Sequence, residues 1–261
     1  METLDSSEFY DRLAGAFDVM TDWKSRLTYE MPFIRRILEE YKARSVLDTA
    51  CGTGWHAITL AQQGYEAAGC DASPAMIERA RANAVQTGVQ VPFQVADFAH
   101  LNTFQEKFDA VLCLGNSLPH LLTQEDLIEA LKQMETRLHP GGVLILHNLN
   151  YDLRWKKKPR FFSANGSADA LVWRFADYGP ELITFHTALF EQSPAKGTAS
   201  DVSWSVQVNS TLQRPLRQQY LDEALSLAGL GNVRHLSGLD GSAFDKENSG
   251  DLVIVADLRD S

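Results

Sequence analysis

A glycine-rich loop after the first expected strand carries the clearest chemical signal in this sequence. Residues 46–57 read VLDTACGTGWHA, which is a short apolar strand, a Gly-x-Gly loop and the start of a helix. Gly52 and Gly54 let a ligand approach the backbone closely and leave amide N–H groups exposed at the helix start. Because ligands of open α/β sheets bind beyond the carboxyl ends of the strands, this loop predicts a cofactor site.

Two carboxylates near the loop indicate which cofactor it holds. Asp71 ends the second expected strand 17 residues after Gly54, where it can bind ribose hydroxyls. Gly52, Gly54 and Ala57 also satisfy the dinucleotide pattern G-x-G-x-x-A, so an NAD(P)-dependent oxidoreductase stays open as an alternative. Asp48 lies four residues before Gly52, where its charge would repel a pyrophosphate and attract a sulfonium or ammonium group. We therefore favour S-adenosylmethionine, which carries both cations and no phosphate.

A regular alternation of apolar strands and helical stretches predicts the fold that positions this loop. We expect an α/β fold with a doubly wound, mostly parallel seven-stranded sheet. The first five strands are expected at residues 45–48, 66–71, 91–96, 108–114 and 143–147. Ser73 is the expected N-cap of a helix that Gly88 ends, and Thr123 is that of a helix reaching residue 138. Residues 139–142, HPGG, then predict a turn into the fifth strand.

Longer β segments after Asn150 predict an antiparallel β insertion after the fifth strand. These segments are expected at residues 171–175, 182–190 and 202–212, and a helix at 218–228 with strands at 233–236 and 252–256 would complete the main sheet. We therefore divide the chain into four parts. They are N-terminal lid helices at 1–40, a cofactor-binding α/β domain at 41–150, the insertion over the substrate pocket at 151–216, and C-terminal elements at 217–261.

The composition excludes several classes of protein. Lys and Arg number 24 against 34 Asp and Glu, a formal net charge of −10 that disfavours a nucleic-acid partner. The longest apolar runs, 110–114 and 143–146, are too short to span a membrane, and the first residues lack a signal peptide. Three cysteines without a CxxC pair imply neither disulfides nor a metal site. We expect a cytoplasmic protein with a small-molecule substrate, no membrane partner and no metal; the sequence leaves its oligomeric state open.

Five segments give the sequence a family resemblance. It resembles the class I S-adenosylmethionine-dependent methyltransferases, and within them the glycine N-methyltransferase and sarcosine/dimethylglycine methyltransferase group. The matching segments are VLDTACGTG at 46–54, GCDASPAM at 69–76, FDAVLCLGNSLPH at 108–120, PGG at 140–142 and NYD at 150–152. The resemblance implies methyl transfer from S-adenosylmethionine to an amine or amino-acid nitrogen of a small polar metabolite. An O-methyltransferase acting on a carboxylate or hydroxyl would share the same cofactor residues and stays open.

Residue roles follow from the motifs and from the resemblance together. The expected cofactor-binding residues are Tyr10, Trp23, Arg26, Asp48, Ala50, Gly52, Gly54, Asp71, Ala72, Met76, Asp97, Phe98 and Leu114. The resemblance implies that Arg26 pairs with the cofactor carboxylate, and Asp97 can accept a hydrogen bond from the adenine amino group. The expected catalytic residues are Asn116, which would orient the acceptor, His120, which could take its proton, and Tyr151.

One departure from the family pattern bears on the acceptor. The glycine enzymes place an arginine directly before the Asn-Tyr-Asp motif to bind the amino-acid carboxylate, whereas this chain has Leu149 there. The sequence therefore lacks the expected anchor for glycine. Arg160, Arg174 and Tyr178 in the insertion are the remaining candidates to contact the acceptor.

Overall fold

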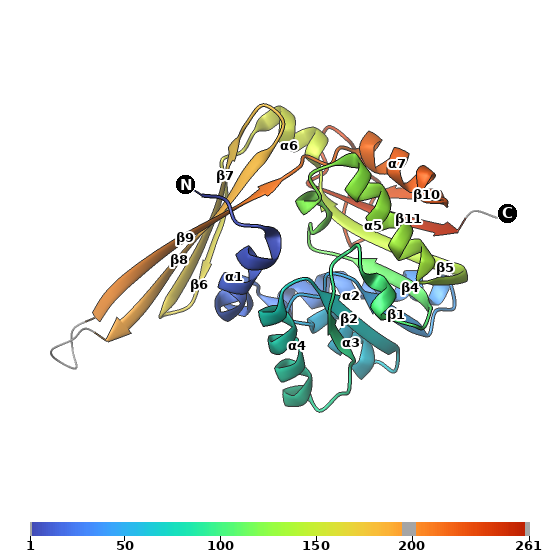
Figure 1. The fold of residues 1–261 in the computed structure, drawn as a ribbon, viewed down its shortest axis with the longest axis horizontal. Helices are drawn as coiled ribbons and strands as arrows, with labels where there is room; N and C mark the ends of the chain where they lie inside the picture. The colour runs from blue at the N-terminus through green and yellow to red at the C-terminus, as the bar shows by residue number, and fades with distance from the viewer. Residues whose placement is uncertain (1, 195–201, 259–261) are drawn as a thin grey trace.

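A seven-stranded sheet forms the centre of the protein. The structure is a computed structural model that describes residues 2–194 and 202–258. The sheet contains β1 (Ser45–Asp48), β2 (Glu66–Asp71), β3 (Phe93–Val95), β4 (Phe108–Cys113), β5 (Leu138–Leu149), β10 (Leu230–Leu236) and β11 (Asp251–Leu258). Its order is β10-β11-β5-β4-β1-β2-β3, and only β11 runs antiparallel to its neighbours (Figure 1). The predicted fold class is confirmed, and strand order reverses beside β1, where such sheets bind ligands.

Helices bury both faces of this sheet. The helices are α2 (Trp23–Glu40), α3 (Trp55–Gln62) and α4 (Pro74–Thr87) on one face, and α5 (Gln124–Thr136) and α7 (Gln218–Leu227) on the other. Each presents apolar residues at helical spacing, as Leu127, Leu131 and Met134 do on α5. The predicted caps are confirmed, since Ser73 accepts from the Met76 N–H and Thr123 from the Asp126 N–H. None of the helices in the described ranges has the length and apolar character needed to span a bilayer.

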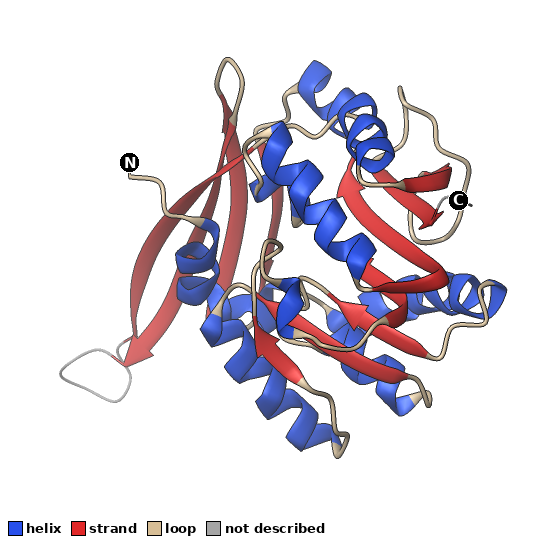
Figure 2. Cartoon of the chain, turned by 45° about the vertical axis from the view of Figure 1, so that its right-hand side comes forward, coloured by secondary structure: helices blue, strands red, loops and turns tan. Residues whose placement is uncertain are grey.

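A second, antiparallel sheet follows β5, as predicted. Its strands, in spatial order, are β6 (Phe161–Gly166), β7 (Ala170–Tyr178), β8 (Ile183–Pro194) and β9 (Val202–Gln213). Helix α1 (Ser6–Met20) lies between this sheet and the main domain (Figures 1 and 2). Its apolar face, including Phe9 and Leu13, packs against Val172 and Leu189 of the insertion. The N-terminal helix therefore connects the two sheets.

One local prediction was wrong, and two elements were missed. The turn predicted at 139–142 belongs to β5, whose register with β4 shifts between the Phe108 and Ala110 pairs, with Gly141 at φ +78°. Proline and two glycines at 140–142 are typical of a turn, but in this protein they form the irregular start of strand β5. The strand β6 and the short helix α6 (Tyr151–Lys157) were not predicted. In α6 the consecutive lysines at its end gave no helical pattern of apolar residues.

Candidate active site

Two cavities meet at the carboxyl edge of the main sheet. One, of about 300 Å³, is lined by four acidic residues, Asp71, Asp97, Asp126 and Glu129, among others, and we call it the acidic cavity. The other, of about 390 Å³, is lined by Arg26, Arg154 and Arg174 among others, and we call it the arginine cavity. Tyr10 of α1 lines both. The two cavities therefore form one site divided by a residue of the N-terminal helix.

The Gly-x-Gly loop holds Asp71 in the acidic cavity. The Gly52 N–H donates to Oδ2 of Asp71 at 2.9 Å, and the Ser73 N–H donates to Oδ1 at 2.9 Å. Burial raises the pKa of Asp71, and these two amides oppose that change. Each carboxylate oxygen can still accept another hydrogen bond, so the side chain is oriented by its own loop and open to a ligand.

Gly54 is required by both its conformation and its surroundings. It begins α3 with φ +84°, a region that side chains disfavour. A Cβ atom there would lie 2.7 Å from the Phe93 ring and 2.9 Å from the Ala80 Cβ. The loop thus packs directly against β3 and α4, which fixes the amide N–H groups at the start of α3.

A buried carboxylate lies at the tip of β1. Asp48 is 1% exposed, and neither of its carboxylate oxygens makes a hydrogen bond of normal geometry within the described part of the chain. Burial raises its pKa to about 7; the Ala50 amide opposes this shift and the Asp71 carboxylate adds to it. A buried carboxylate without a strong partner favours a positive ligand close by.

Arg26 is positioned by a buried relay. Its Nε donates to Oε1 of Glu30 at 2.9 Å, and the His56 Nε2 lies 2.6 Å from Oε2 of the same carboxylate. Glu30 is desolvated, but His56 and Arg26 together lower its pKa to about 2. The guanidinium Nη2 faces the backbone of Gly115, where a Cβ would lie 3.3 Å away. The rest of the guanidinium is thus presented to the arginine cavity.

A chain of hydrogen bonds joins the three predicted catalytic residues to the N-terminal helix. The Asn116 amide donates to the Tyr151 hydroxyl at 3.0 Å, which donates to Oε1 of Gln213 at 3.3 Å. The Gln213 Nε2 lies 3.4 Å from the His120 Nε2, and the Tyr10 hydroxyl lies 3.2 Å from that same nitrogen. Five side chains from four different parts of the fold therefore hold one another in place.

The partners of His120 indicate its protonation. An amide N–H of Gln213 can only donate, so the His120 Nε2 acts as an acceptor and the ring proton resides on Nδ1. Burial lowers the pKa of His120 to about 4. The imidazole is therefore neutral at pH 7 and a weak base, and its contacts orient Tyr10. The prediction that His120 takes the proton of the acceptor stays a prediction.

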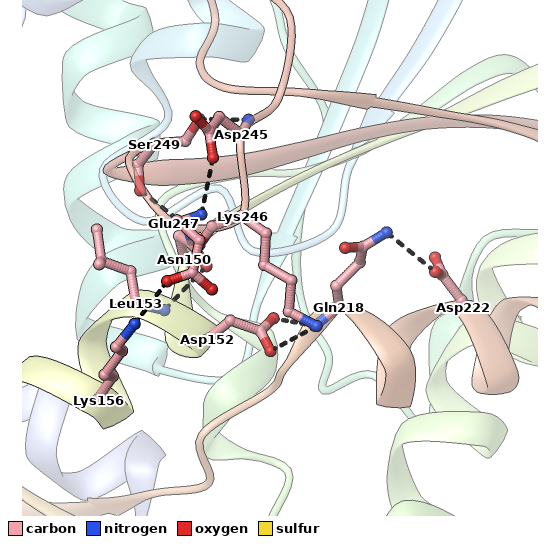
Figure 3. A network of polar contacts seen from close by, with 10 residues as sticks. All are labelled: Asn150, Asp152, Leu153, Lys156, Gln218, Asp222, Asp245, Lys246, Glu247 and Ser249. Carbon is pink, nitrogen blue, oxygen red and sulfur yellow. Dashed lines mark hydrogen bonds and ion pairs between the residues drawn. The ribbon is translucent and has the colours of Figure 1, made fainter.

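The Asn-Tyr-Asp motif fixes α6 beside the site. Asn150 caps α6 by accepting from the Leu153 N–H, and its Nδ2 donates to the carbonyl oxygens of Lys246 and Ser249 (Figure 3). Asp152 accepts from the Gln218 N–H at 2.9 Å and pairs with Lys246. The two polar residues anchor the helix to the C-terminal segment, which leaves the buried Tyr151 between them pointing into the hydrogen-bond chain.

Most predicted site residues lie on one or other cavity. The acidic cavity is lined by Tyr10, Ala50, Asp71, Ala72, Asp97, Phe98 and His120. The arginine cavity is lined by Tyr10, Arg26 and Asn116. The residues that line neither are Asp48, Gly52, Gly54, Met76, Leu114 and Tyr151, and Trp23 lies in a separate surface depression. That depression also contains Asp18, to which the Trp23 indole donates at 2.8 Å.

Of the three residues proposed to contact the acceptor from the insertion, one lines the arginine cavity and two do not. Arg174 lines the arginine cavity, whereas Arg160 is exposed and pairs with Asp177 at 3.2 Å. Tyr178 donates to the Pro159 carbonyl at 3.1 Å and does not line the cavity. Sequence reasoning missed Arg154 and Gln213 altogether. Arg154 lies four residues after the N-cap Asn150, a spacing that could have placed it on the same helix face as the motif.

The three cysteines are buried and line neither cavity. Cys51, Cys70 and Cys113 are free and buried, and burial raises the pKa of each thiol. Such thiols are poor nucleophiles. Among residues 2–194 and 202–258, no three His, Cys, Asp or Glu side chains are grouped to hold a metal ion.

Comparison with known proteins identifies relatives over nearly the whole chain. A family model described as a methyltransferase domain matches residues 46–142. The chain is 32% identical over 253 residues to the glycine/sarcosine N-methyltransferase of Parasynechococcus marenigrum (strain WH8102), covering 96% of this chain and 84% of that protein. It is 36% identical over 148 residues to the glycine/sarcosine N-methyltransferase of Aphanothece halophytica, a match that spans 56% of each protein.

Solved structures share the fold over a similar extent. The CcbJ methyltransferase from Streptomyces caelestis superposes with a TM-score of 0.80 at 22% identity. The superposition covers 98% of this chain and 99% of that one. The insertion and the N-terminal helices are therefore part of a shared architecture, not additions peculiar to this chain.

Proposed function

Because this chain belongs to the class I S-adenosylmethionine-dependent methyltransferases, we propose that it methylates the amine nitrogen of a small amino acid. The enzyme class and the cofactor, S-adenosylmethionine, follow from the family. The nature of the acceptor rests on one observation, the meeting at Tyr10 of an acidic cavity and an arginine cavity. The acidic cavity suits the nucleoside and sulfonium of S-adenosylmethionine, and the arginine cavity suits anionic groups, namely the cofactor carboxylate at Arg26 and the carboxylate of the acceptor.

The residues present fit this cofactor. Asp71 and Asp97 offer carboxylates to ribose hydroxyls and to an adenine amino group, and Arg26 offers a guanidinium to a carboxylate. The acidic cavity is lined by four carboxylates and, among its described lining residues, by no Lys or Arg. A dinucleotide pyrophosphate would be repelled there, so the oxidoreductase alternative loses its support. Asp48 lines neither cavity but directly precedes Thr49 and Ala50 of the acidic cavity, so a sulfonium bound there would add a positive charge near its buried carboxylate.

Catalysis by the chain is mainly positioning. S-adenosylmethionine, when bound, supplies an electrophilic methyl group on a sulfonium centre. Asn116 lines the arginine cavity with its amide held at both ends, since its Oδ1 accepts from the Leu149 N–H at 3.0 Å. Holding an acceptor in line can contribute about 7–11 kcal/mol. Nearby guanidinium groups also disfavour an ammonium and so favour the neutral amine that reacts.

We propose roles for the four parts of the chain as well. Residues 1–40 close the cofactor site through Tyr10 and Arg26, residues 41–150 hold the cofactor, residues 151–216 cover the acceptor, and residues 217–261 complete the sheet and anchor α6. A reducing compartment such as the cytoplasm suits three buried free thiols.

Product identification tests the proposed reaction. The purified protein is incubated with S-adenosylmethionine carrying a ¹³C-methyl group and a panel of amino acids, hydroxy acids and amines, and the products are identified by NMR. We expect the labelled methyl on nitrogen of an amino acid. A reaction without acceptor measures uncoupled loss of the label. Methyl esters or ethers as products would instead establish the O-methyltransferase alternative, and no methyl transfer would contradict the proposal.

A further inference from the structure

The arginine cavity contains two guanidinium groups without an acidic partner. Arg26 is compensated by Glu30 at 2.9 Å. Arg154 and Arg174 line the same cavity, and among residues 2–194 and 202–258 neither has a carboxylate within 4.0 Å. Partly buried charges are retained in proteins when something pairs with them. The cavity is therefore built for a negatively charged occupant.

Arg174 is oriented toward the cavity from β7. Its Nε donates to the Ser163 Oγ on the neighbouring strand β6 at 2.8 Å, which fixes the plane of the guanidinium. Burial lowers the pKa of Arg174, and the charges of Arg26 and Arg154 lower it further. The two terminal nitrogens are left for a ligand, and a planar fork of this kind matches a carboxylate.

Arg154 approaches from the opposite element, α6. Its guanidinium lies over the Phe162 ring at 4.1 Å, and Nη1 is buried without a hydrogen bond of normal geometry in the described ranges. The helix that carries it cannot easily shift, because Asn150 and Asp152 anchor it to the C-terminal segment (Figure 3). Two rigidly held arginines thus face one cavity from two elements.

Counting charge gives the number of acidic groups in the acceptor. Arg26 and Glu30 balance each other, so the cavity keeps the two positive charges of Arg154 and Arg174. Bound S-adenosylmethionine adds one net positive charge, because its sulfonium and ammonium together outweigh its single carboxylate. A single carboxylate, as in glycine, would leave one of the two arginines unpaired. Leu149 takes the place of the arginine expected for glycine, so the anchoring charge comes from other elements of this chain.

Resting on the proposed N-methylation, we infer that the acceptor is an amine bearing two acidic groups, one bound by Arg154 and one by Arg174. A dicarboxylic amino acid is the simplest member of this class. The two arginines then determine specificity, while Asn116 and the cofactor determine where the methyl group goes. Neutral side chains of equal size would bind more weakly, because they leave a half-buried guanidinium without a partner.

Matched acceptors test this inference. Aspartate and glutamate are compared with asparagine and glutamine, which have nearly the same shape and one negative charge fewer, and with glycine and sarcosine. We expect kcat/KM to be at least about tenfold higher for each acid than for its amide, in line with the loss of one charged pairing. Arg174→Gln and Arg154→Gln should raise KM for the acids and abolish their preference over the amides. Arg160→Gln, an exposed arginine outside the cavity, is the control and should change neither.

Binding measurements separate the possible failures. Calorimetry with S-adenosylhomocysteine shows whether each variant is folded and retains its cofactor site. Equal rates for acids and amides, or unchanged kinetics in Arg174→Gln, would overturn the inference and leave the N-methyltransferase proposal standing. If the protein methylates no amine, the proposed function is refuted. The anion site can then still be tested by measuring how aspartate and glutamate bind to the complex with S-adenosylhomocysteine. If Arg154→Gln and Arg174→Gln bind these acids as tightly as the unchanged protein, the anion site is refuted as well.

Discussion

The acidic cavity and the arginine cavity differ in charge and in the way the chain builds them. The acidic cavity is formed largely by residues that follow β1, β2 and β3, joined by α1 and α5. The arginine cavity draws its charged residues from α2, α6 and the insertion, elements that are far apart in the sequence. Among the described lining residues the two cavities share one, Tyr10 of α1, which the sequence had predicted for the site.

This difference matches the difference between the cofactor, which all members of the family share, and the acceptor, which varies between them. A nucleoside cofactor is the same for every member, and one loop with two strand ends can hold it. An acceptor varies, and its cavity is made from elements that can change without disturbing the sheet. Under the proposed function the two cavities also favour opposite charges, because Asp71 repels a carboxylate and Arg174 repels a cation.

The largest expected effect comes from Asn116→Ala. The change removes the amide that joins the Leu149 N–H to the Tyr151 hydroxyl in the arginine cavity. We expect kcat to fall about 100-fold, since misplacement of reacting groups costs that much, while affinity for S-adenosylhomocysteine stays unchanged. Steady-state kinetics and calorimetry measure the two quantities.

Asn232→Ala is the matched control for that variant. Both asparagines have a positive φ, +69° at Asn116 and +46° at Asn232, but the Asn232 amide on β10 donates to Asp257 of β11 in an exposed position. It carries the same backbone strain and should leave kcat intact. A loss of cofactor affinity in Asn116→Ala as large as its loss of turnover would show that the two cavities do not divide the work as described.

Asp71→Asn tests the acidic cavity in the same way. The carboxylate accepts from the Gly52 and Ser73 amides and faces the cavity. We expect cofactor binding to weaken by roughly 1–3 kcal/mol through lost charge-assisted hydrogen bonds. The control is Asp109→Asn, which removes a carboxylate that accepts from the Arg44 and Ser45 amides near the start of β1. Calorimetry that gave equal losses for both variants would assign Asp71 a structural role only.

The sequence predicted several residues of the acidic cavity because the signals for them are local. Ser73, Gly54 and Asp71 lie within a short stretch of chain, and strand, loop, helix and acid occur in the order that the chemistry requires. Cap residues and apolar periodicity likewise predicted α4 and α5 to within two residues at each end. Such features depend on neighbours in the chain and not on the final packing.

The acceptor half could not be predicted because its contacts are long-range. Gln213 meets His120 across 93 positions and Tyr151 across 62, which no spacing rule relates. Arg154 lies just before the basic residues 156–160, and no local pattern distinguishes it from Arg160, which is exposed. Only the packing of α6 distinguishes the two arginines. The sequence was therefore sufficient to predict the cofactor, whereas the residues around the acceptor depend on tertiary structure.

Asp48 predicts how the affinity for S-adenosylmethionine depends on pH. Its pKa in the folded protein is raised to about 7 by burial, and a sulfonium favours its ionised form. Affinity for S-adenosylmethionine should therefore rise with pH up to about 7 and level off above it, by up to about tenfold per pH unit below 7. S-adenosylhomocysteine, whose sulfur is neutral, serves as the matched ligand and should show a weaker dependence.

The same group predicts a stability effect of opposite sign. Because its pKa is higher in the folded than in the unfolded chain, Asp48 binds a proton on folding. Its contribution to the free energy of unfolding is present below about pH 4 and is lost as pH rises through about 7. Urea titrations without cofactor measure this term. Asp48→Asn should reduce both pH dependences and leave the part that comes from Asp71, whose pKa burial also raises. An unaltered cofactor profile in that variant would place the responsible charge elsewhere.

The smallest effect is expected where the two cavities meet. Tyr10→Phe removes one hydroxyl, which lies 3.2 Å from the His120 Nε2 and lines both cavities. Loss of one hydrogen bond of about 0.5–1.5 kcal/mol corresponds to about 2- to 10-fold in affinity. Since the residue belongs to both sides, the Kd of S-adenosylhomocysteine and the KM of the acceptor should rise together. Tyr41→Phe removes a comparable hydroxyl, bonded to Asp257 at 3.0 Å, and should alter neither. A change confined to one ligand would assign Tyr10 to that cavity alone.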